Sequence, residues 1–194
     1  MNINYNLYFK CLLSRIPFSF VNNLSQDVKN YNILVQPQTL YFLTVHLRFS
    51  SLFYATQLVE VFSYEVPLAY TNVQRSFVSK SDSSLVVYNY HSMLTQDRFF
   101  IFMQPGASYT NSTLGGSQVQ SIAELFSSAN WLEREIAELS GLTFNGKKDL
   151  RNLMLQYGDS SAPFQKSFPT IGLREMFYNP VKDTIVQSPV TIQL

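Results

Sequence analysis

The spacing of apolar side chains predicts a helix followed by three strands in the first half of the chain. Apolar residues recur at helical spacing over residues 40–49, which predicts a mostly buried helix. The run from Leu58 to Val66 is rich in β-branched and aromatic residues and predicts a strand. Two further strand-like runs, 85–90 and 98–103, are separated by seven residues and predict a hairpin.

Helical spacing returns between residues 119 and 141. Val119, Ile122, Leu125 and Phe126 predict one helix, and a second helix follows as far as Gly141. In this second helix Leu132, Ile136 and Leu139 form an apolar stripe, Asn130 and Glu133 are spaced as a capping box, and Gly141 occupies the position of a C-cap glycine. The order of elements predicts an α+β fold, with an antiparallel or mixed sheet and helices packed on one face.

The remainder of the chain is rich in glycine, proline and polar residues. It contains a predicted short helix at 150–157 and a final hairpin with strands at 176–178 and 184–186. A tail with so few periodic apolar positions is either disordered or wrapped on a partner, and its scattered aromatic residues favour wrapping. We therefore divide the chain into an amino-terminal extension (1–35), a globular α+β domain (36–141) and an extended partner-wrapping arm with a terminal hairpin (142–194).

The composition favours a chain that hides much of its surface. Only 14% of the residues are charged, against about 25% in an ordinary soluble domain. The 16 Phe and 12 Tyr residues also fit interface cores, although an AT-rich genome would raise the same counts. The net charge of +1 and the lack of a long basic run argue against nucleic-acid binding.

Few residues of this chain are suited to holding a cofactor. Cys11 is the only cysteine, so the chain can form no internal disulfide and cannot supply the thiolates of an iron–sulfur cluster. With only His46 and His91, a zinc site is not expected, and both histidines are predicted to pack rather than to bind metal. No uninterrupted apolar run is long enough for a membrane span, and the amino terminus fits a short docked helix better than a secretory signal.

Two alternative functions, catalysis and RNA binding, can be weighed against the residues. Glu135 and Glu138 would be the acid–base pair of a free-standing hydrolase, but they lie three residues apart on one helical face and cannot straddle a substrate. Residues 98–102 have the aromatic content of an RNA-stacking strand, but they lack its glycine and a surrounding basic patch. We interpret the ionisable residues at 133–138 as the end of a helix that launches the arm.

A set of residues on both sides of Gly141 has the spacing of a known family signature. These signature residues, predicted to orient the arm or to lie at an interface, are Trp131, Glu133, Arg134, Glu135, Glu138, Gly141, Phe144, Gly146, Lys147, Asp149, Leu150, Arg151, Pro163, Lys166, Phe168 and Pro169. In this pattern the chain resembles the thirty-kilodalton core subunit of respiratory complex I, NADH:ubiquinone oxidoreductase, which is called subunit 9 in mitochondria. The resemblance covers roughly residues 36–194 and is strongest after Ser121.

The resemblance implies a role in assembly. Members of this family are core structural subunits of the peripheral arm, where they support the quinone-reducing module in electron transfer from NADH to ubiquinone, coupled to proton pumping. It implies that the chain itself is non-catalytic and free of cofactors, with FMN, iron–sulfur clusters and ubiquinone in partner subunits. It further implies a hetero-oligomer on the matrix side of the mitochondrial inner membrane, with the arm wrapping the forty-nine-kilodalton subunit. The abundance of Phe, Tyr and Asn, without a clear presequence, favours mitochondrial encoding.

Five positions depart from the family pattern. Glu138 replaces the usual Asp, and Ser140 replaces an apolar or aromatic residue. The dipeptide Lys147-Lys148 stands where His-Pro is common. Ser167 replaces an Asp, which removes one carboxylate from the expected partner surface.

Overall fold

The computed structural model describes residues 23–26, 30–50, 56–66, 83–93, 96–105 and 118–191. Cys11 and the docked helix predicted near the amino terminus lie outside the described residues.

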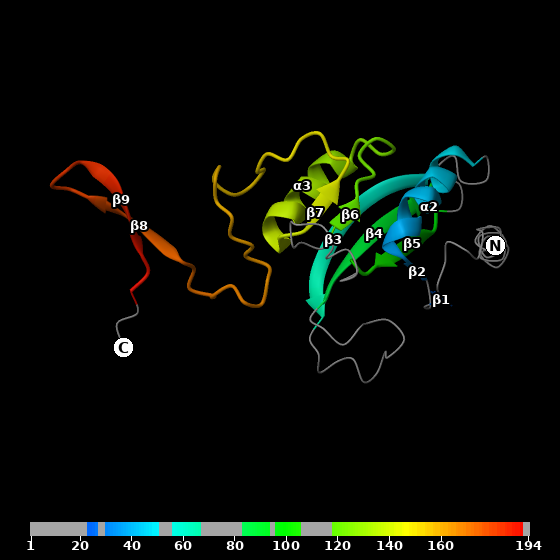
Figure 1. Ribbon diagram of the computed structural model, residues 1–194, viewed down its shortest axis with the longest axis horizontal. Coiled ribbons are helices and arrows are strands. Elements are labelled where there is room, and N and C mark those ends of the chain that lie inside the picture. The colour runs from blue at the N-terminus through cyan, green and yellow to red at the C-terminus, as the bar shows by residue number, and fades with distance from the viewer. Residues whose placement is uncertain are drawn as a thin grey trace.

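The body of the chain is built on a five-stranded mixed sheet with the strand order β1-β2-β5-β4-β3 (Figure 1). Neighbouring strands run antiparallel, except β2 and β5, which are parallel. The predicted strands and the hairpin between β4 and β5 are confirmed. The strands are β1 (Asn23–Gln26), β2 (Asn30–Val35), β3 (Thr56–Val66), β4 (Ser83–Ser92) and β5 (Arg98–Met103).

Strand β2 corrects the predicted start of the globular domain at residue 36. Tyr31, Ile33 and Val35 are at most 2% exposed and belong to the core, and β2 pairs with β5 along its whole length. These apolar residues alternate with Asn30, Asn32 and Leu34, so the segment has the period-two pattern of a strand. The assignment of β2 to the amino-terminal extension is therefore wrong. The sequence pattern did not reveal this strand, because a strand this short, directly before a helix, carries only a weak local signal.

Two helices cover one face of the sheet, as predicted. Helix α2 (Pro37–Phe49) buries Leu40, Leu43 and Leu47, and helix α3 (Ala129–Ser140) buries Ile136 and Leu139. Apart from Leu139, these helix residues join one core cluster with alternate residues of the strands. In β5 these are Phe99, Ile101 and Met103, so this strand turns its alternate side chains into the core. The hypothesis of an RNA-stacking strand is therefore not supported.

The helix predicted over residues 119–126 is wrong. Residues Gln118–Gln120 form strand β6, which pairs in parallel with β7 (Thr143–Asn145). A single turn follows, in which the backbone N–H groups of Leu125 and Phe126 both donate to the carbonyl of Ile122. Val119, Ile122 and Phe126 are buried as the periodicity required. The pairing with β7, which lies beyond α3 in the sequence, decides the backbone conformation.

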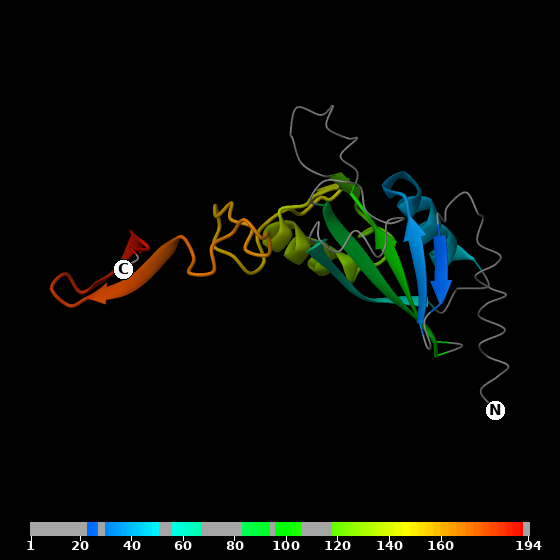
Figure 2. The same cartoon turned by 90° about the horizontal axis from the view of Figure 1, so that it is seen from below.

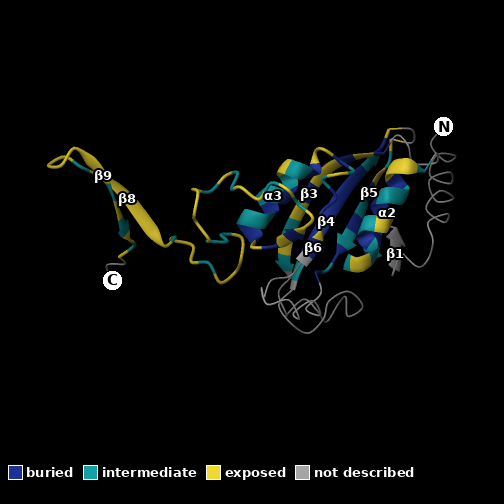
Figure 3. Cartoon of the chain, turned by 45° about the horizontal axis from the view of Figure 1, so that its top comes forward, coloured by how far each residue is buried: buried dark blue, intermediate teal, exposed yellow. Residues whose placement is uncertain are grey.

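The boundary predicted at residue 141 also lies too early. Leu142 and Phe144 are at most 5% exposed and belong to the core, so β7 is part of the globular body. Between residues 148 and 191, in contrast, no residue is buried. This segment leads away from the sheet to the predicted hairpin, formed by β8 (Arg174–Asn179) and β9 (Thr184–Pro189) (Figures 2 and 3). The helix predicted at 150–157 is wrong, because turns and bends occupy these residues.

Candidate functional site

Most of the signature residues lie on helix α3 and on residues 146–168, which we call the arm base. Three groups of contacts along α3 fix the arm base to the body. They lie at Glu133 near the beginning of the helix, at Arg134 and Glu138 in its middle, and at its carboxyl end. All three join α3 to residues that are distant in the sequence.

Glu133 and Lys147 form an ion pair inside the chain. Lys147 Nζ lies 3.1 Å from Glu133 Oε2, and the two side chains are 1% and 0% exposed. Glu133 also accepts hydrogen bonds from Ser121 Oγ (2.6 Å) and from the backbone N–H of Ile122 (2.8 Å). Lys147 donates in addition to the carbonyl of Asn130, 2.8 Å away. Removing two charges from water is costly, and these hydrogen bonds supply part of the compensation.

The capping box predicted at the start of α3 is wrong. The cap position is Ser128, which makes no side-chain capping bond, and Asn130 lies inside the first turn. Glu133 turns its carboxylate away from the helix terminus, toward Ser121 and Lys147. It therefore joins α3 to the turn after β6 and to Lys147 in the arm base. The structure makes Glu133 a link between three segments.

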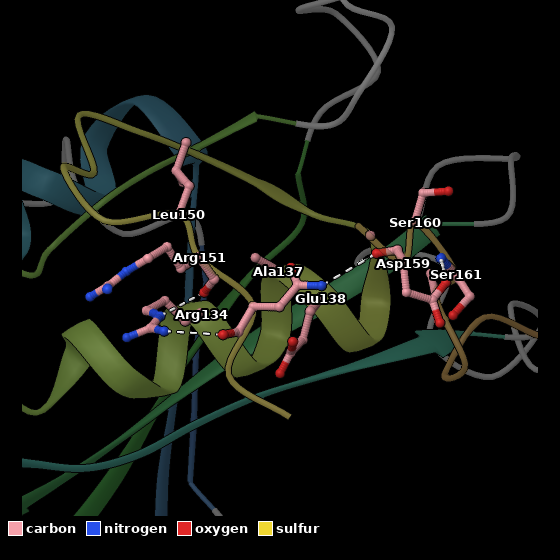
Figure 4. A pocket seen from close by; sticks show the side chains of 11 residues that line it. Arg134, Ala137, Glu138, Leu150, Arg151, Asp159, Ser160 and Ser161 are labelled. Carbon is pink, nitrogen blue, oxygen red and sulfur yellow. Dashed lines mark hydrogen bonds between the residues drawn. The ribbon is translucent and has the colours of Figure 1, made fainter. Parts of the chain in front are cut away.

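The Arg134 side chain binds backbone carbonyls in the next part of the arm base. Its Nε donates to the carbonyl of Arg151 at 2.8 Å, and its Nη2 donates to the carbonyl of Asn152 at 3.3 Å (Figure 4). The guanidinium also lies 5.6 Å from the ring centroid of Trp131 and 3.5 Å from Asp149 Oδ2. Its side chain is only 9% exposed, so these groups replace most of its water.

Asp149 is paired mainly with Arg151, two residues further along the chain. Arg151 Nε and Arg151 Nη2 each donate to a carboxylate oxygen of Asp149 at 3.0 Å. These side-chain hydrogen bonds, together with one from the backbone of Arg151, hold the pKa of Asp149 well below its ordinary value. Asp149 is therefore ionised throughout the neutral pH range. Its pairing with Arg151 fixes the turn that brings the carbonyls of Arg151 and Asn152 close to the Arg134 guanidinium.

Glu138 binds three consecutive backbone N–H groups of the arm base. Its carboxylate accepts from Leu153 (2.9 Å), Met154 (2.6 Å) and Leu155 (3.2 Å). These amides donate to a side chain instead of a helical carbonyl, which explains why no helix forms at 150–157. A carboxylate occupied in this way is a structural acceptor, so the geometry does not support a hydrolase built on Glu135 and Glu138.

The carboxyl end of α3 is closed by the arm base. The backbone N–H of Phe164 donates to the carbonyl of Leu139 (2.8 Å), and Gln165 Nε2 donates to the carbonyl of Ser140 (3.1 Å). Gly141 is the predicted C-cap glycine, with φ +71° and its N–H bonded to Ala137. A Cβ at this position would lie 2.7 Å from Gln165 Nε2, so a side chain here would displace Gln165, and the positive φ itself favours glycine.

A pocket of about 190 Å³ lies between α3 and the arm base (Figure 4). Arg134 and Glu138 line it from the helix, and Asp159, Ser160 and Ser161 line it from the opposite side. The described part of the chain brings no three His, Cys, Asp or Glu side chains together in the manner of a metal site. His46 and His91 are both half-buried, one on α2 and one at the end of β4. Among the described residues no helix combines the length and the apolarity that crossing a membrane requires.

The structure separates the signature residues into buried and exposed groups. Glu133, Phe144 and Lys147 have side chains inside the chain, which fits the orienting role rather than the interface role among the two that we predicted. Trp131 is 61% exposed. Leu150, Arg151, Lys166 and Pro169 are also exposed, and Pro163 and Phe168 are half-buried.

Sequence reasoning missed several polar partners of α3. Ser121 binds Glu133, Gln165 binds the end of the helix, and Ser63 on β3 forms a hydroxyl pair with Ser140 at 2.5 Å. The backbone N–H of Lys166 also donates to Glu65 on β3 (2.7 Å). No local pattern marks serine or glutamine residues of this kind, because their partners lie far away in the sequence.

Several known proteins are similar to this chain in sequence. Residues 33–173 match the family described as "Respiratory-chain NADH dehydrogenase, 30 Kd subunit". NADH-ubiquinone oxidoreductase subunit 9 of Paramecium primaurelia is 35% identical over 116 residues, which are 59% of this chain and 51% of that protein. The C subunit of NADH-quinone oxidoreductase from Burkholderia ambifaria is 45% identical over 75 residues, which are 39% of this chain and 38% of that protein. The matches thus span about half or less of these relatives.

A solved structure shares the fold. It belongs to the membrane-bound sulfane sulfur reductase, an archaeal respiratory membrane complex, and the similarity has a TM-score of 0.62 with 86% of each chain covered. At 10% sequence identity this similarity concerns the fold alone. The family match covers most of the chain, including α3 and the arm base with the contacts described above. The chain therefore belongs to the family of the 30 kDa subunit of respiratory-chain NADH dehydrogenase.

Proposed function

We propose that this chain is a core structural subunit of the peripheral arm of respiratory NADH:ubiquinone oxidoreductase. In this role the globular body supports the quinone-reducing module, and the carboxy-terminal arm wraps the forty-nine-kilodalton subunit. The chain itself is non-catalytic and holds no cofactor, while FMN, iron–sulfur clusters and ubiquinone belong to partner subunits. The complex oxidises NADH, reduces ubiquinone and pumps protons. Family membership and the names of the relatives support this proposal.

The single observation that carries the proposal is the exposed apolar surface of the hairpin. A two-stranded hairpin is at best marginally stable alone in water. This hairpin nevertheless presents large apolar side chains to solvent, with Met176, Phe177, Tyr178, Val181 and Ile185 each 50–91% exposed. Aromatic residues and methionine are enriched where protein interfaces are fully buried. A partner protein that covers the hairpin would supply the core that the hairpin lacks.

The contacts at α3 support a wrapping role in a second way. Arg134 and Glu138 fix the backbone of the arm base, and Leu139 accepts a hydrogen bond from Phe164. An arm that is already held in place loses less conformational entropy when it binds than a free tail would lose. We therefore assign to α3 the role of orienting the arm before its partner arrives.

The proposed location follows from the proposed complex. We place the chain at the matrix side of the mitochondrial inner membrane, in a hetero-oligomer, and we propose that its gene is mitochondrial. Finding the gene in nuclear DNA would contradict the last statement.

Native-gel separation of solubilised membranes tests the assembly proposal. We expect the chain to migrate with a very large complex that oxidises NADH and contains the forty-nine-kilodalton subunit. Phe177→Ser combined with Ile185→Ser should abolish this co-migration without changing the thermal unfolding of the free chain, because both side chains are already exposed. Thr184→Ala combined with Gln187→Ala, on the same hairpin, is the matched control. Isolation of the wild-type chain only as a free monomer would contradict the proposal.

A further inference from the structure

Both faces of the terminal hairpin carry apolar side chains. In the register of β8 and β9, Phe177 lies opposite Val186, and Tyr178 lies opposite Ile185. Successive side chains of a strand point to opposite faces of the sheet. Tyr178, Ile185 and Met176 therefore share one face, which we call the tyrosine face. Phe177 and Val186 share the other face, which we call the phenylalanine face.

No residue between 174 and 190 is buried, so neither face of the hairpin packs against the described body of the chain (Figure 3). On the tyrosine face Met176, Tyr178 and Ile185 are 62%, 58% and 75% exposed. On the phenylalanine face Phe177 is 50% exposed. A pair of strands that rests on a single surface normally turns apolar side chains toward that surface and polar side chains toward water. The two apolar faces of this hairpin therefore indicate contact on both sides.

A polar side chain on each face already has its hydrogen bond inside the hairpin. On the tyrosine face the hydroxyl of Tyr178 donates to Asp183 Oδ1. On the phenylalanine face Ser188 Oγ donates to Glu175 Oε1 at 3.3 Å. A buried donor without a partner costs free energy, and these two hydroxyls enter an interface with their partners already in place. Burial of either face is therefore less costly than the polar residues alone would indicate.

The occupant that fits two apolar faces is a groove in another protein. A second copy of this hairpin, paired about a two-fold axis, would pack through one face of each copy and leave the other face in water. The charges of residues 174–190 cancel, because Arg174 and Lys182 are balanced by Glu175 and Asp183. An anionic lipid surface attracts clusters of basic residues, which this segment lacks. The family to which the chain belongs is one of subunits, so a protein partner is at hand.

We propose that the hairpin inserts into an apolar groove of one partner subunit, whose two walls cover the tyrosine face and the phenylalanine face. This inference rests on the proposed function and adds to it the manner in which the arm binds. The hairpin is enclosed on both sides, and it does not lie with one face on a flat surface. The partner supplies two layers of apolar side chains, with the hairpin as the layer between them.

Photo-crosslinking in the assembled complex tests the insertion, because residues 176 and 177 are neighbours that point to opposite faces. Benzoylphenylalanine is placed at 176 in one variant and at 177 in another, and each complex is irradiated after native-gel separation. We expect both positions to crosslink to the same partner subunit. A crosslink from only one position, crosslinks to two different subunits, to lipid or to a second copy of this chain, or no crosslink from either position would overturn the insertion.

Serine substitutions on one face at a time provide a second test. Ile185→Ser on the tyrosine face and Phe177→Ser on the phenylalanine face should each reduce the amount of chain that co-migrates with the large complex. Thr184→Ala combined with Gln187→Ala, which changes one polar residue on each face, is the control and should leave co-migration unchanged. If only one of the two serine variants loses co-migration, the insertion is wrong although the assembly role stands. Failure of the wild-type chain to co-migrate would instead contradict the proposed function itself.

Discussion

The buried ion pair beneath α3 gives the most demanding prediction. Lys147→Met keeps much of the length of the side chain and removes its charge, which leaves the Glu133 carboxylate inside the chain with only Ser121 and Ile122 as partners. Both side chains of the pair are at most 1% exposed, so water cannot replace the missing ammonium without opening the structure. Removing one partner of a buried pair typically costs about 3–5 kcal/mol.

This cost is large compared with the stability of an ordinary domain, which is about 5–15 kcal/mol. For a chain of this size about 1 kcal/mol shifts the Tm by about 2–4 °C, so we expect Lys147→Met to lower the Tm by about 6–20 °C. The assay is urea and thermal unfolding of the full chain, followed by circular dichroism. Lys148→Met, at the exposed neighbouring position, is the matched control.

A double variant separates the loss of the pair from the loss of packing. Glu133→Gln with Lys147→Met removes both charges, and we expect it to be more stable than Lys147→Met alone, because no uncompensated charge remains buried. The reasoning would be refuted if Lys147→Met lost no more stability than Lys148→Met. It would also be refuted if the double variant lost the full sum of the two single losses.

Three further predictions concern the arm base. Glu138→Gln should speed amide hydrogen exchange at the three N–H groups that this carboxylate binds, since a neutral acceptor is weaker; unchanged exchange would contradict its role. Gly141→Ala should lower the unfolding midpoint more than Gly158→Ala, because both have positive φ but only the former places a Cβ against another side chain; equal losses would remove the steric argument. Asp149 has a pKa lowered in the folded state, so its contribution to stability is present above the unfolded value of about 3.9 and is lost as the pH falls through the folded pKa. In an NMR titration, Arg151→Gln should return that pKa toward its ordinary value, and an unperturbed titration in the wild type would refute the pairing.

Elements whose burial follows a local period can be predicted from the amino-acid sequence of this chain. The helix at 40–49, the strands β3, β4 and β5, and the hairpin at the end of the arm all follow from patterns of neighbouring residues. Gly141 is predictable as a C-cap because its conformational requirement is also local. The family signature identifies the important region around α3, although it does not show what each residue does there.

The roles of the polar residues, in contrast, depend on the three-dimensional arrangement of the chain. The spacing of Glu133 predicts a cap for its own helix, but the side chain turns to Lys147, 14 residues further along the chain. Val119 fits a helical period but lies in β6, because its backbone bonds with β7. Local periodicity predicts which side chains are buried, because it determines which residues share the face of a helix or strand that packs against the core. A buried charge or an unpaired backbone group must pair with a group that the fold brings close to it. That partner can lie far away in the sequence, so no short stretch of sequence predicts it.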